Sequence, residues 1–293
     1  MRSLGSLLLV LLLCGVCFAS DNKFVRISPE YINTQLKNAP NDPAERVRMM
    51  RAKFMLAGCG ADQITEQAVP GEAVPNIFCT LPGKEEGTIV IAARLDFKSK
   101  GDELVVDNAT LNLLPLLAQS LQPTQRRYSF VFLALAGCDR RKGSAYYLSQ
   151  LSPAQKKSIR GMVEFDHLGR SPARYMYPSQ ETVNDQVSGT VVSQRSSHSD
   201  TALRPLLLRA ASAVNMEDPH EFEDFYFDDT INFHHENIIA LTLTSPAYIV
   251  LIRPGDHQVK LLRPELDMNV YYQTYNMLCV YMLNLDNRLE ARK

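Results

Sequence analysis

Two short, continuous apolar runs dominate the hydrophobic pattern of this chain. The first extends over 87–96 as Gly-Thr-Ile-Val-Ile-Ala-Ala-Arg-Leu-Asp, and the second over 128–136. Apolar runs of this length, rich in β-branched residues and ending in charged or turn residues, are typical of strands buried on both faces of a sheet. The apolar segment 111–121 lies between them and is expected to be a helix. The pattern therefore predicts a β-α-β unit.

Charged and polar residues lie where these two strands end. Arg94 and Asp96 close the first strand, and Asp107 follows in the connection to the helix. The run Gly137-Cys138-Asp139 follows the second strand and leads through Gly143-Ser144 into another helix. In sheets of this kind the chemistry lies at the carboxyl edge of the strands. We therefore expect these side chains to share one crevice.

The remaining pattern adds further helices and strands to this unit. Asp42-Pro43 reads as an N-cap followed by proline at the first helical position. The other expected elements are a strand pair at 64–69 and 76–81, a strand at 159–166 that ends in Asp166, a helix at 202–214, a strand at 238–243 and a closing helix within 264–285. Segment 171–200 has little periodicity and is expected to form loops and edge structure over the crevice. Pro115 should bend its helix or shift its start, since an interior proline costs ~3 kcal/mol.

These elements predict the fold class and the domain organisation. We expect a three-layer α/β/α sandwich with a mixed, mostly parallel central sheet. Residues 20–43 should form an N-terminal lead-in, and 44–293 a single domain.

Residues 1–19 have the features of a secretory signal peptide. Arg2 supplies the positive start, 7–13 the apolar core, and Cys17-Phe-Ala19 a small-x-small cleavage site. The apolar core is short for a membrane anchor. We therefore predict a secreted or periplasmic protein without stable membrane insertion, whose mature chain begins near Ser20 or Asp21.

The net charge and the cysteine content indicate which partners and which disulfides to expect. The formal net charge of the 293 residues is −1, which gives no reason to expect nucleic acid or an anionic membrane as a partner. Beyond the signal peptide the chain has Cys59, Cys79, Cys138 and Cys279. The pair Cys59–Cys79 is the most plausible disulfide, and four buried free thiols are nearly as plausible.

The order of polar residues along the chain resembles that of the co-catalytic zinc exopeptidases, which include bacterial leucyl aminopeptidases and glutaminyl cyclases. In that family the first strand ends in His-x-Asp, an Asp-Asp or Asp-Asn stands at a helix start, and a Glu-Glu follows the next strand. A further Asp and a late loop His complete the set. Here Asp96, Asp107, Asn108 and Asp166 match, and the resemblance covers nearly the whole mature chain.

Several positions depart from the family pattern. Arg94 stands where the first His ligand belongs, and Gly137-Cys138 stand where the Glu-Glu pair belongs. Arginine stays protonated and has no lone pair to give to a metal. The general base is absent, because Gly137 has no side chain. Cys138 as thiolate, or Asp139 after a shift by one residue, are the remaining candidates for the missing ligand.

Two later segments also depart from the pattern. Asp228-Asp229-Thr230-Ile231-Asn232-Phe233 resembles an acid-acid-His-x-Pro-Phe motif, with Thr230 in place of the histidine. His234 and His235 follow and are interpreted as solvated loop residues. The position of the last histidine ligand falls on Arg253 without a gap, or on His257 if the loop slips. The sequon Asn108-Ala109-Thr110 lies at the crevice, too enclosed for glycosylation.

The signal peptide, the family resemblance and the replaced ligand and base positions together favour an exported, aminopeptidase-like pseudoenzyme. We expect it to act by binding a peptide or protein. We expect no catalytic residue, no cofactor and no metal, and only Asp107 and Asp166 remain as metal ligands if any is bound. The alternative is an active zinc aminopeptidase or glutaminyl cyclase-like enzyme with a rearranged site, and a third possibility is a structural role of the outer surface alone. Loss of the metal would leave Asp107 and Asp166 unpaired. We therefore predict that Arg94 and Arg253 point into the old metal site and bond to Asp107, Asp166 or Asp96.

Overall fold

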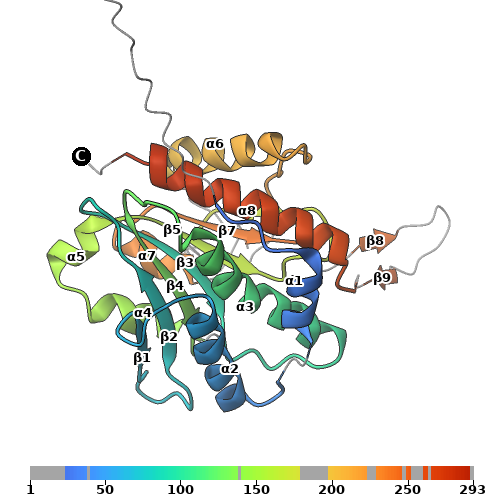
Figure 1. Ribbon diagram of the computed structural model, residues 1–293, viewed down its shortest axis with the longest axis horizontal. Helices are drawn as coiled ribbons and strands as arrows, with labels where there is room; N and C mark the ends of the chain where they lie inside the picture. The colour runs from blue at the N-terminus through green and yellow to red at the C-terminus, as the bar shows by residue number, and fades with distance from the viewer. Residues whose placement is uncertain are drawn as a thin grey trace, which may run out of the picture.

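A seven-stranded mixed sheet with helices on both faces forms the centre of the molecule (Figure 1). The computed structural model describes residues 24–37, 40–137, 140–178, 197–222, 229–245, 249–251, 260–262 and 265–290. The strands of this sheet, in chain order, are β1 (Ile64–Gln67), β2 (Asn76–Leu81), β3 (Thr88–Arg94), β4 (Ser129–Leu135), β5 (Ile159–Asp166), β6 (Arg174–Met176) and β7 (Ala240–Thr244). A separate hairpin pairs β8 (Ile249–Leu251) with β9 (Lys260–Leu262).

The sheet has the order β1-β2-β4-β3-β5-β7-β6. Its four central strands, β4, β3, β5 and β7, run parallel, while β1, β2 and β6 pair antiparallel at the two sides. The predicted mixed sheet is confirmed. Because the four central strands are parallel, their carboxyl ends lie along one edge, and β3 and β5 end there in Arg94 and Asp166.

Two hydrophobic cores hold the layers together. The described helices are α1 (Pro29–Leu36), α2 (Pro43–Leu56), α3 (Asp102–Leu121), α4 (Lys142–Ser149), α5 (Pro153–Ser158), α6 (Ser197–Ala213), α7 (Thr230–His235) and α8 (Met268–Arg288). The larger core lies between one face of the sheet and α1, α2, α3, α6 and α8, and the smaller core lies between the other face and α4 and α7. Figure 1 shows α6 and α8 lying side by side over the sheet.

Helix α3 differs from the expectation at both its start and its proline. It begins at Asp102, so Asp107 lies in its second turn and not in a connecting loop. Pro115 lies inside this continuous, almost wholly buried helix and does not mark its start. Packing of α3 against the sheet and against α2 and α8 offsets the cost of the proline.

The N-terminal part agrees closely with the sequence signals. The carboxylate of Asp42 caps α2 by accepting a hydrogen bond of 3.1 Å from the backbone N–H of Glu45, and Pro43 opens the helix. A disulfide joins Cys59 to Cys79 and thereby ties the end of α2 to β2, which confirms the predicted pair. Cys279 is a buried free thiol. In segment 171–200, expected to form loops and edge structure, β6 is indeed an edge strand of the sheet, but α6 begins at Ser197, earlier than expected.

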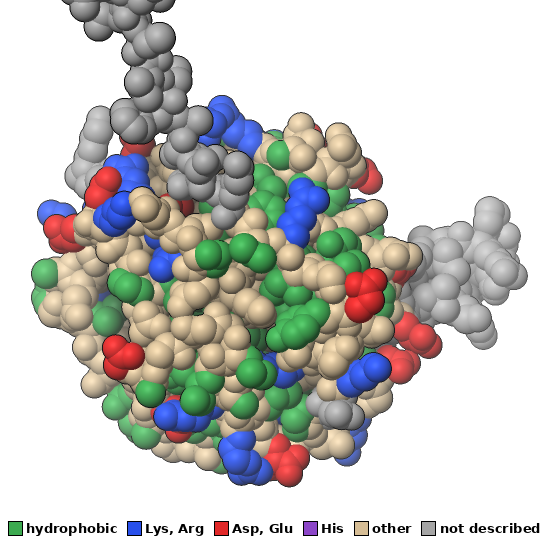
Figure 2. Space-filling view, viewed as in Figure 1, with side chains coloured by type: hydrophobic (Ala, Val, Ile, Leu, Met, Phe, Trp, Pro, Cys, Tyr) green, Lys and Arg blue, Asp and Glu red, His purple; other side chains and the backbone are tan. Residues whose placement is uncertain are grey.

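The outer surface in Figure 2 carries acidic and basic side chains interspersed with apolar ones. Within the described residues, no helix combines the length and the apolar character that a membrane span requires. The predicted signal peptide at 1–19 lies outside the described residues.

Candidate functional site

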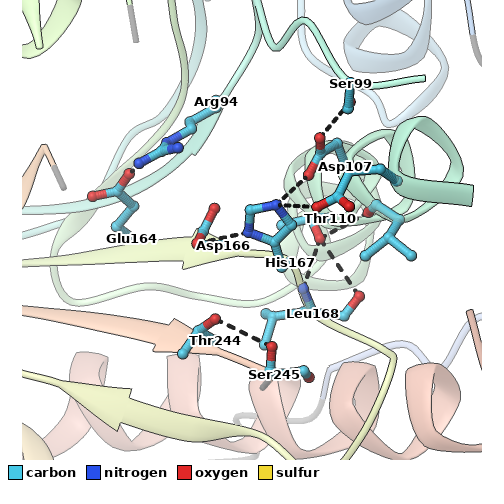
Figure 3. A network of polar contacts seen from close by, with 12 residues as sticks. Arg94, Ser99, Asp107, Thr110, Glu164, Asp166, His167, Leu168, Thr244 and Ser245 are labelled. Atoms are coloured by element: carbon cyan, nitrogen blue, oxygen red, sulfur yellow. Dashed lines mark hydrogen bonds and ion pairs between the residues drawn. The ribbon is translucent and has the colours of Figure 1, made fainter. Parts of the chain in front are cut away.

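The ends of three neighbouring strands bring the predicted residues to one place. Arg94 is the last residue of β3, Gly137 follows β4, and Asp166 is the last residue of β5. Asp107 comes from α3, which lies beside these strand ends (Figure 3). The structure therefore brings Arg94, Asp107 and Asp166 together at this edge of the sheet, as the β-α-β pattern led us to expect.

The centre of this crevice is the imidazole ring of His167 (Figure 3). Its Nδ1 atom lies 2.8 Å from Oδ2 of Asp166. Its Nε2 atom lies 3.1 Å from Oδ1 of Asp107 and 3.1 Å from Oε1 of Glu103. Both ring nitrogens face carboxylate oxygens, so the ring has to be the doubly protonated imidazolium to donate on both sides.

The charges of this cluster shift one another's pKa values. Burial alone would lower the pKa of His167, but the carboxylates of Asp166, Asp107 and Glu103 raise it to about 9. Burial would raise the pKa of Asp166, but His167, Arg94 and Arg170 hold it below its ordinary value. For Asp107 burial prevails and raises the pKa, although His167 and the Ser99 hydroxyl, which donates to Oδ2 at 2.5 Å, oppose it. Asp107 is thus the less strongly ionised of the two aspartates.

A second cation supports the same cluster. The side chain of Arg170 is 1 % exposed, and its Nη2 atom lies 3.4 Å from Oε2 of Glu103. Glu103 thus lies between His167 and Arg170, one oxygen toward each. Two aspartates and one glutamate are balanced here mainly by one imidazolium and one guanidinium.

Arg94 has an ion-pair partner that was not among those predicted. Its Nε atom lies 3.9 Å from Oε1 of Glu164, a residue of β5 that is completely buried. Glu164 points to the same face of the strand as Asp166, two positions on, and the charge of Arg94 also lowers the pKa of Asp166. The prediction placed Arg94 correctly in the crevice but did not include Glu164.

Glu164 connects the crevice to α7. Its Oε2 atom accepts a hydrogen bond of 2.8 Å from the backbone N–H of Asp229. The Asp229 carboxylate accepts in turn from the hydroxyl of Ser144, and the same hydroxyl oxygen accepts from Nδ2 of Asn232 at 2.7 Å. Thr230, in the position of the family histidine, is also buried. The sequence-predicted residue Asp229 therefore belongs to a buried polar network behind Arg94, and Thr230 follows it as the first residue of α7.

Asp96 joins two strand ends, and Asn108 is buried within a helix. Oδ2 of Asp96 accepts a hydrogen bond of 2.7 Å from the backbone N–H of Gly137, which joins the ends of β3 and β4. Asn108 is buried in α3, 1 % exposed. The histidines expected in a solvated loop lie in α7, with His235 exposed and His234 half-buried. The predicted positions Cys138, Asp139, Arg253 and His257 lie outside the described residues.

The crevice does not fit a zinc ion. Zinc is held by neutral imidazole, thiolate or carboxylate groups that converge on an open position. Here the ring of His167 fills the space between Asp107 and Asp166 and engages both. Arg94 adds a guanidinium, which cannot ligate a metal, at the end of β3. Among the described residues, no group of three or more His, Cys, Asp or Glu side chains is placed to hold a metal ion.

Four charged residues of the site escaped the sequence analysis, namely Glu103, Glu164, His167 and Arg170, and the first three had a signal. His167 directly follows the strand-end aspartate. Glu164 is an acid inside an otherwise apolar strand, which requires a partner. Glu103 stands with Asp102 just after Gly101, the acidic first turn of a helix start that was placed too late.

Comparison with known proteins shows which fold and which family this chain shares. No curated protein matches the sequence. Among solved structures, glutaminyl cyclases from an Acidobacteriales bacterium and from Macrostomum lignano superpose with TM-scores of 0.60 and 0.60, at 15% and 12% sequence identity. These matches cover 92% and 88% of this chain, and 98% and 89% of theirs. They show a shared fold.

An aminopeptidase from Aneurinibacillus sp. strain AM-1 also matches, with a TM-score of 0.52 at 15% identity over 75% of this chain. The chain spans only 50% of the length of that aminopeptidase. A model of peptidase family M28 matches residues 76–273, which contain every strand end of the crevice. The chain therefore belongs to peptidase family M28.

Proposed function

We propose that this chain is a non-catalytic, exported member of its family that acts by binding a peptide or protein. The observation that carries the proposal is the position of His167, whose ring lies between the carboxylates of Asp107 and Asp166 and is bonded to both. In a metal-dependent hydrolase of this family that space belongs to metal and to the water that the metal activates.

The surroundings of Gly137 also support a loss of hydrolysis. Activation of a metal-bound water requires a base within hydrogen-bond reach, and Gly137 has none to offer. A Cβ atom at Gly137 would lie 2.9 Å from Cβ of Lys142 and 3.1 Å from Cγ of Glu72. The side chains of Lys142 and Glu72 therefore occupy the space into which a side chain at this position would extend.

A binding role is supported by the charge that the crevice retains. Replacement of buried ion pairs by apolar residues of similar volume is often neutral or stabilising. An apolar set of similar volume in place of Arg94 with Glu164, or of His167 with its three acids, would therefore serve stability as well. The presence of these charged groups suits a site that holds fixed charges for a ligand.

Export is supported by two independent features. The signal-like start at 1–19 predicts secretion. The disulfide Cys59–Cys79 is typical of proteins that fold in oxidising compartments. N-terminal sequencing of the exported chain should find a start near Ser20 or Asp21, and a chain that retains Met1 would contradict export by this route.

Metal analysis and turnover test the central proposal. We expect less than one zinc per chain after purification without chelator, no release of amino acids from aminoacyl-nitroanilides and no cyclisation of N-terminal glutamine. The Arg94→His variant should remain inactive, since the base is still missing. Two zinc ions per chain, with turnover abolished in Asp107→Ala, would instead establish an active enzyme with a rearranged site.

The binding role has its own test. Fluorescence polarisation with peptides that differ in their N-terminal residue should detect saturable binding, weakened by Arg94→Met in a folded variant. Peptides that bind the Arg94→Met variant as well as the natural chain would place the ligand elsewhere on the surface.

A further inference from the structure

Lys53 carries a buried positive charge that has no acidic partner. Its Nζ atom donates to the backbone carbonyl oxygen of Gln35 at 2.5 Å and to Oδ1 of Asn112, and both acceptors are uncharged. Within the described part of the chain Lys53 forms no ion pair, and burial lowers its pKa to about 8. A buried charge is costly unless a counter-charge accompanies it. This position therefore lacks a negatively charged group.

Lys53 lines a hollow where α1, α2 and α3 meet. The hollow has an empty volume of about 220 Å³, which includes its opening to solvent, and its enclosed part has room for about one water-sized group. Its lining includes Gln35 of α1, Lys53 and Leu56 of α2, and Asn112, Leu116 and Gln119 of α3. Asn112 and Gln119 follow Asp107 by 5 and 12 positions, about 8 and 18 Å along α3. The hollow is thus separate from the crevice around His167.

The hollow presents both polar and apolar groups to a ligand. An ammonium group has three N–H donors, and the third of Lys53 has no acceptor within the described residues. The side-chain amides of Gln35 and Gln119 have no partner in this part of the structure either. Beside them lie Leu56, which is 67% exposed, and Leu116. The hollow thus offers one positive charge, two amides and an apolar rim.

We propose that this hollow binds the free C-terminal end of a peptide or protein whose last residue is apolar. One oxygen of the terminal carboxylate enters the enclosed part, accepts from the third N–H of Lys53 and supplies the missing counter-charge. The last side chain lies on Leu56 and Leu116, and the amides of Gln35 and Gln119 bond the peptide backbone. The inference goes beyond the proposed function, because it concerns a second site.

Calorimetric titration of the mature chain with N-acetylated tetrapeptides tests the choice of ligand. Acetyl-Ala-Gly-Ala-Leu with a free carboxylate should bind at one site per chain. The same peptide with a C-terminal amide should bind at least about tenfold more weakly, because it lacks the charge-assisted hydrogen bond. Octanoate has the carboxylate and an apolar chain but no peptide backbone, so it should bind more weakly than the peptide acid.

Three substitutions test the residues. Lys53→Gln removes the charge and keeps an amide that can donate to the same two oxygens, and it should weaken binding of the peptide acid at least about tenfold. Lys37→Gln makes the same change at the exposed C-cap of α1, and should alter the affinity by less than about twofold. Leu56→Ser, on the exposed rim, should weaken binding about threefold or more, and it carries the test if Lys53→Gln does not fold.

The ionisation of Lys53 gives a reading that a merely structural role would not produce. A bound carboxylate favours the ammonium form, so saturation with the peptide acid should raise the pKa of Lys53 from about 8, measured by nuclear magnetic resonance of its side chain. By linkage, the affinity should be about tenfold lower at pH 9 than at pH 6.5. Tyr31 is the other titratable side chain among the lining residues.

Several outcomes would overturn the inference. These are equal affinities for the peptide acid and its amide, tighter binding of octanoate than of the peptide acid, no binding at millimolar peptide, and undiminished binding in folded Lys53→Gln or in Leu56→Ser. A loss of binding in Arg94→Met would place the C-terminal end in the crevice instead. None of these outcomes concerns metal content, turnover or peptides recognised by their N-terminal residue, so each leaves the proposed function to its own tests.

Discussion

The guanidinium Nε atom of Arg46 donates a hydrogen bond of 2.7 Å to the carbonyl oxygen of Leu95, 49 positions along the chain. The same group donates to the carbonyl oxygens of Pro40, Asn41 and Phe97, and it stacks 4.0 Å from the centre of the Phe97 ring. Arg46 is 1 % exposed. It fixes the segment that leaves β3 immediately after Arg94, and thereby one wall of the crevice.

Replacement of this arginine should destabilise the fold. Arg46→Ala leaves buried carbonyl oxygens without donors, so we expect a loss of about 3 kcal/mol in the free energy of unfolding, measured by urea denaturation. Arg48→Ala, two positions on, removes a side chain that is 69% exposed, and should change stability by less than about 0.5 kcal/mol. Equal effects of the two substitutions would show that the hydrogen bonds of Arg46 do not contribute to the free energy of unfolding.

Stability should depend on pH through His167. The folded pKa of about 9 exceeds the ordinary 6.5, so the stabilisation is fully present below pH 6.5 and is lost as the pH rises through about 9. The groups that face it are Glu103, Asp107 and Asp166. The shift corresponds to about 3 kcal/mol.

The comparison with His167→Asn isolates this effect. Burial lowers the pKa of Lys53 to about 8, which opposes the trend, because the cost of keeping its charge is relieved as the pH rises above 8. Lys53 is the same in both chains. We therefore expect the stability difference between the natural chain and His167→Asn to shrink between pH 6.5 and pH 9.5, measured by urea denaturation. A constant difference would mean that the ring does not titrate with folding.

A side chain at Gly137 should be poorly tolerated. Its φ is 66°, and an added Cβ lies 2.9 Å from Cβ of Lys142, so Gly137→Ala should cost about 2 kcal/mol or more. Gly71→Ala provides the matched control. There φ is 78° and the nearest atom is the flexible Nζ of Lys142 at 3.5 Å, so about 1 kcal/mol is expected. A larger loss at Gly71 would contradict close packing at Gly137.

The disulfide should contribute to stability through the loop that it closes. Cys59 and Cys79 are 20 positions apart, which corresponds to about 3 kcal/mol of loop entropy in the unfolded chain. The double variant Cys59→Ala and Cys79→Ala should lose about this much in non-reducing denaturation. It should also lose the sensitivity of the natural chain to reductant, whereas Cys279→Ala should keep that sensitivity.

The sequence predicted the fold because its strands are strongly apolar and end in unambiguous signals. Strands β2 and β5 begin and end where the pattern placed them, and the paired cysteines lie at the two sides of β1. The predicted crevice also follows from parallel strand ends alone. Such features depend on local composition and on a small number of topological rules.

The partners within the crevice were harder to predict because they depend on side-chain direction. Arg94 was expected to reach strand-end aspartates, and it does act on the charge of Asp166, but its ion pair with Glu164, two positions earlier on β5, was not predicted. His167 reaches Asp107 through an unusual backbone angle that no residue pattern encodes. The start of α3 was placed too late because the continuous apolar run begins only at Leu111, whereas the helix begins with the acidic turn at 102–103.

The burial of Asn108 has a practical consequence for producing this protein. Asn108-Ala109-Thr110 satisfies the acceptor pattern for N-linked sugar, yet Asn108 is 1 % exposed inside α3. Oligosaccharide can be attached only before α3 packs, and a chain that carries it has no room to bury the residue. A eukaryotic secretory host would therefore divide newly made chains into unmodified ones that fold and sugar-bearing ones that are degraded, while a bacterial host makes no such division.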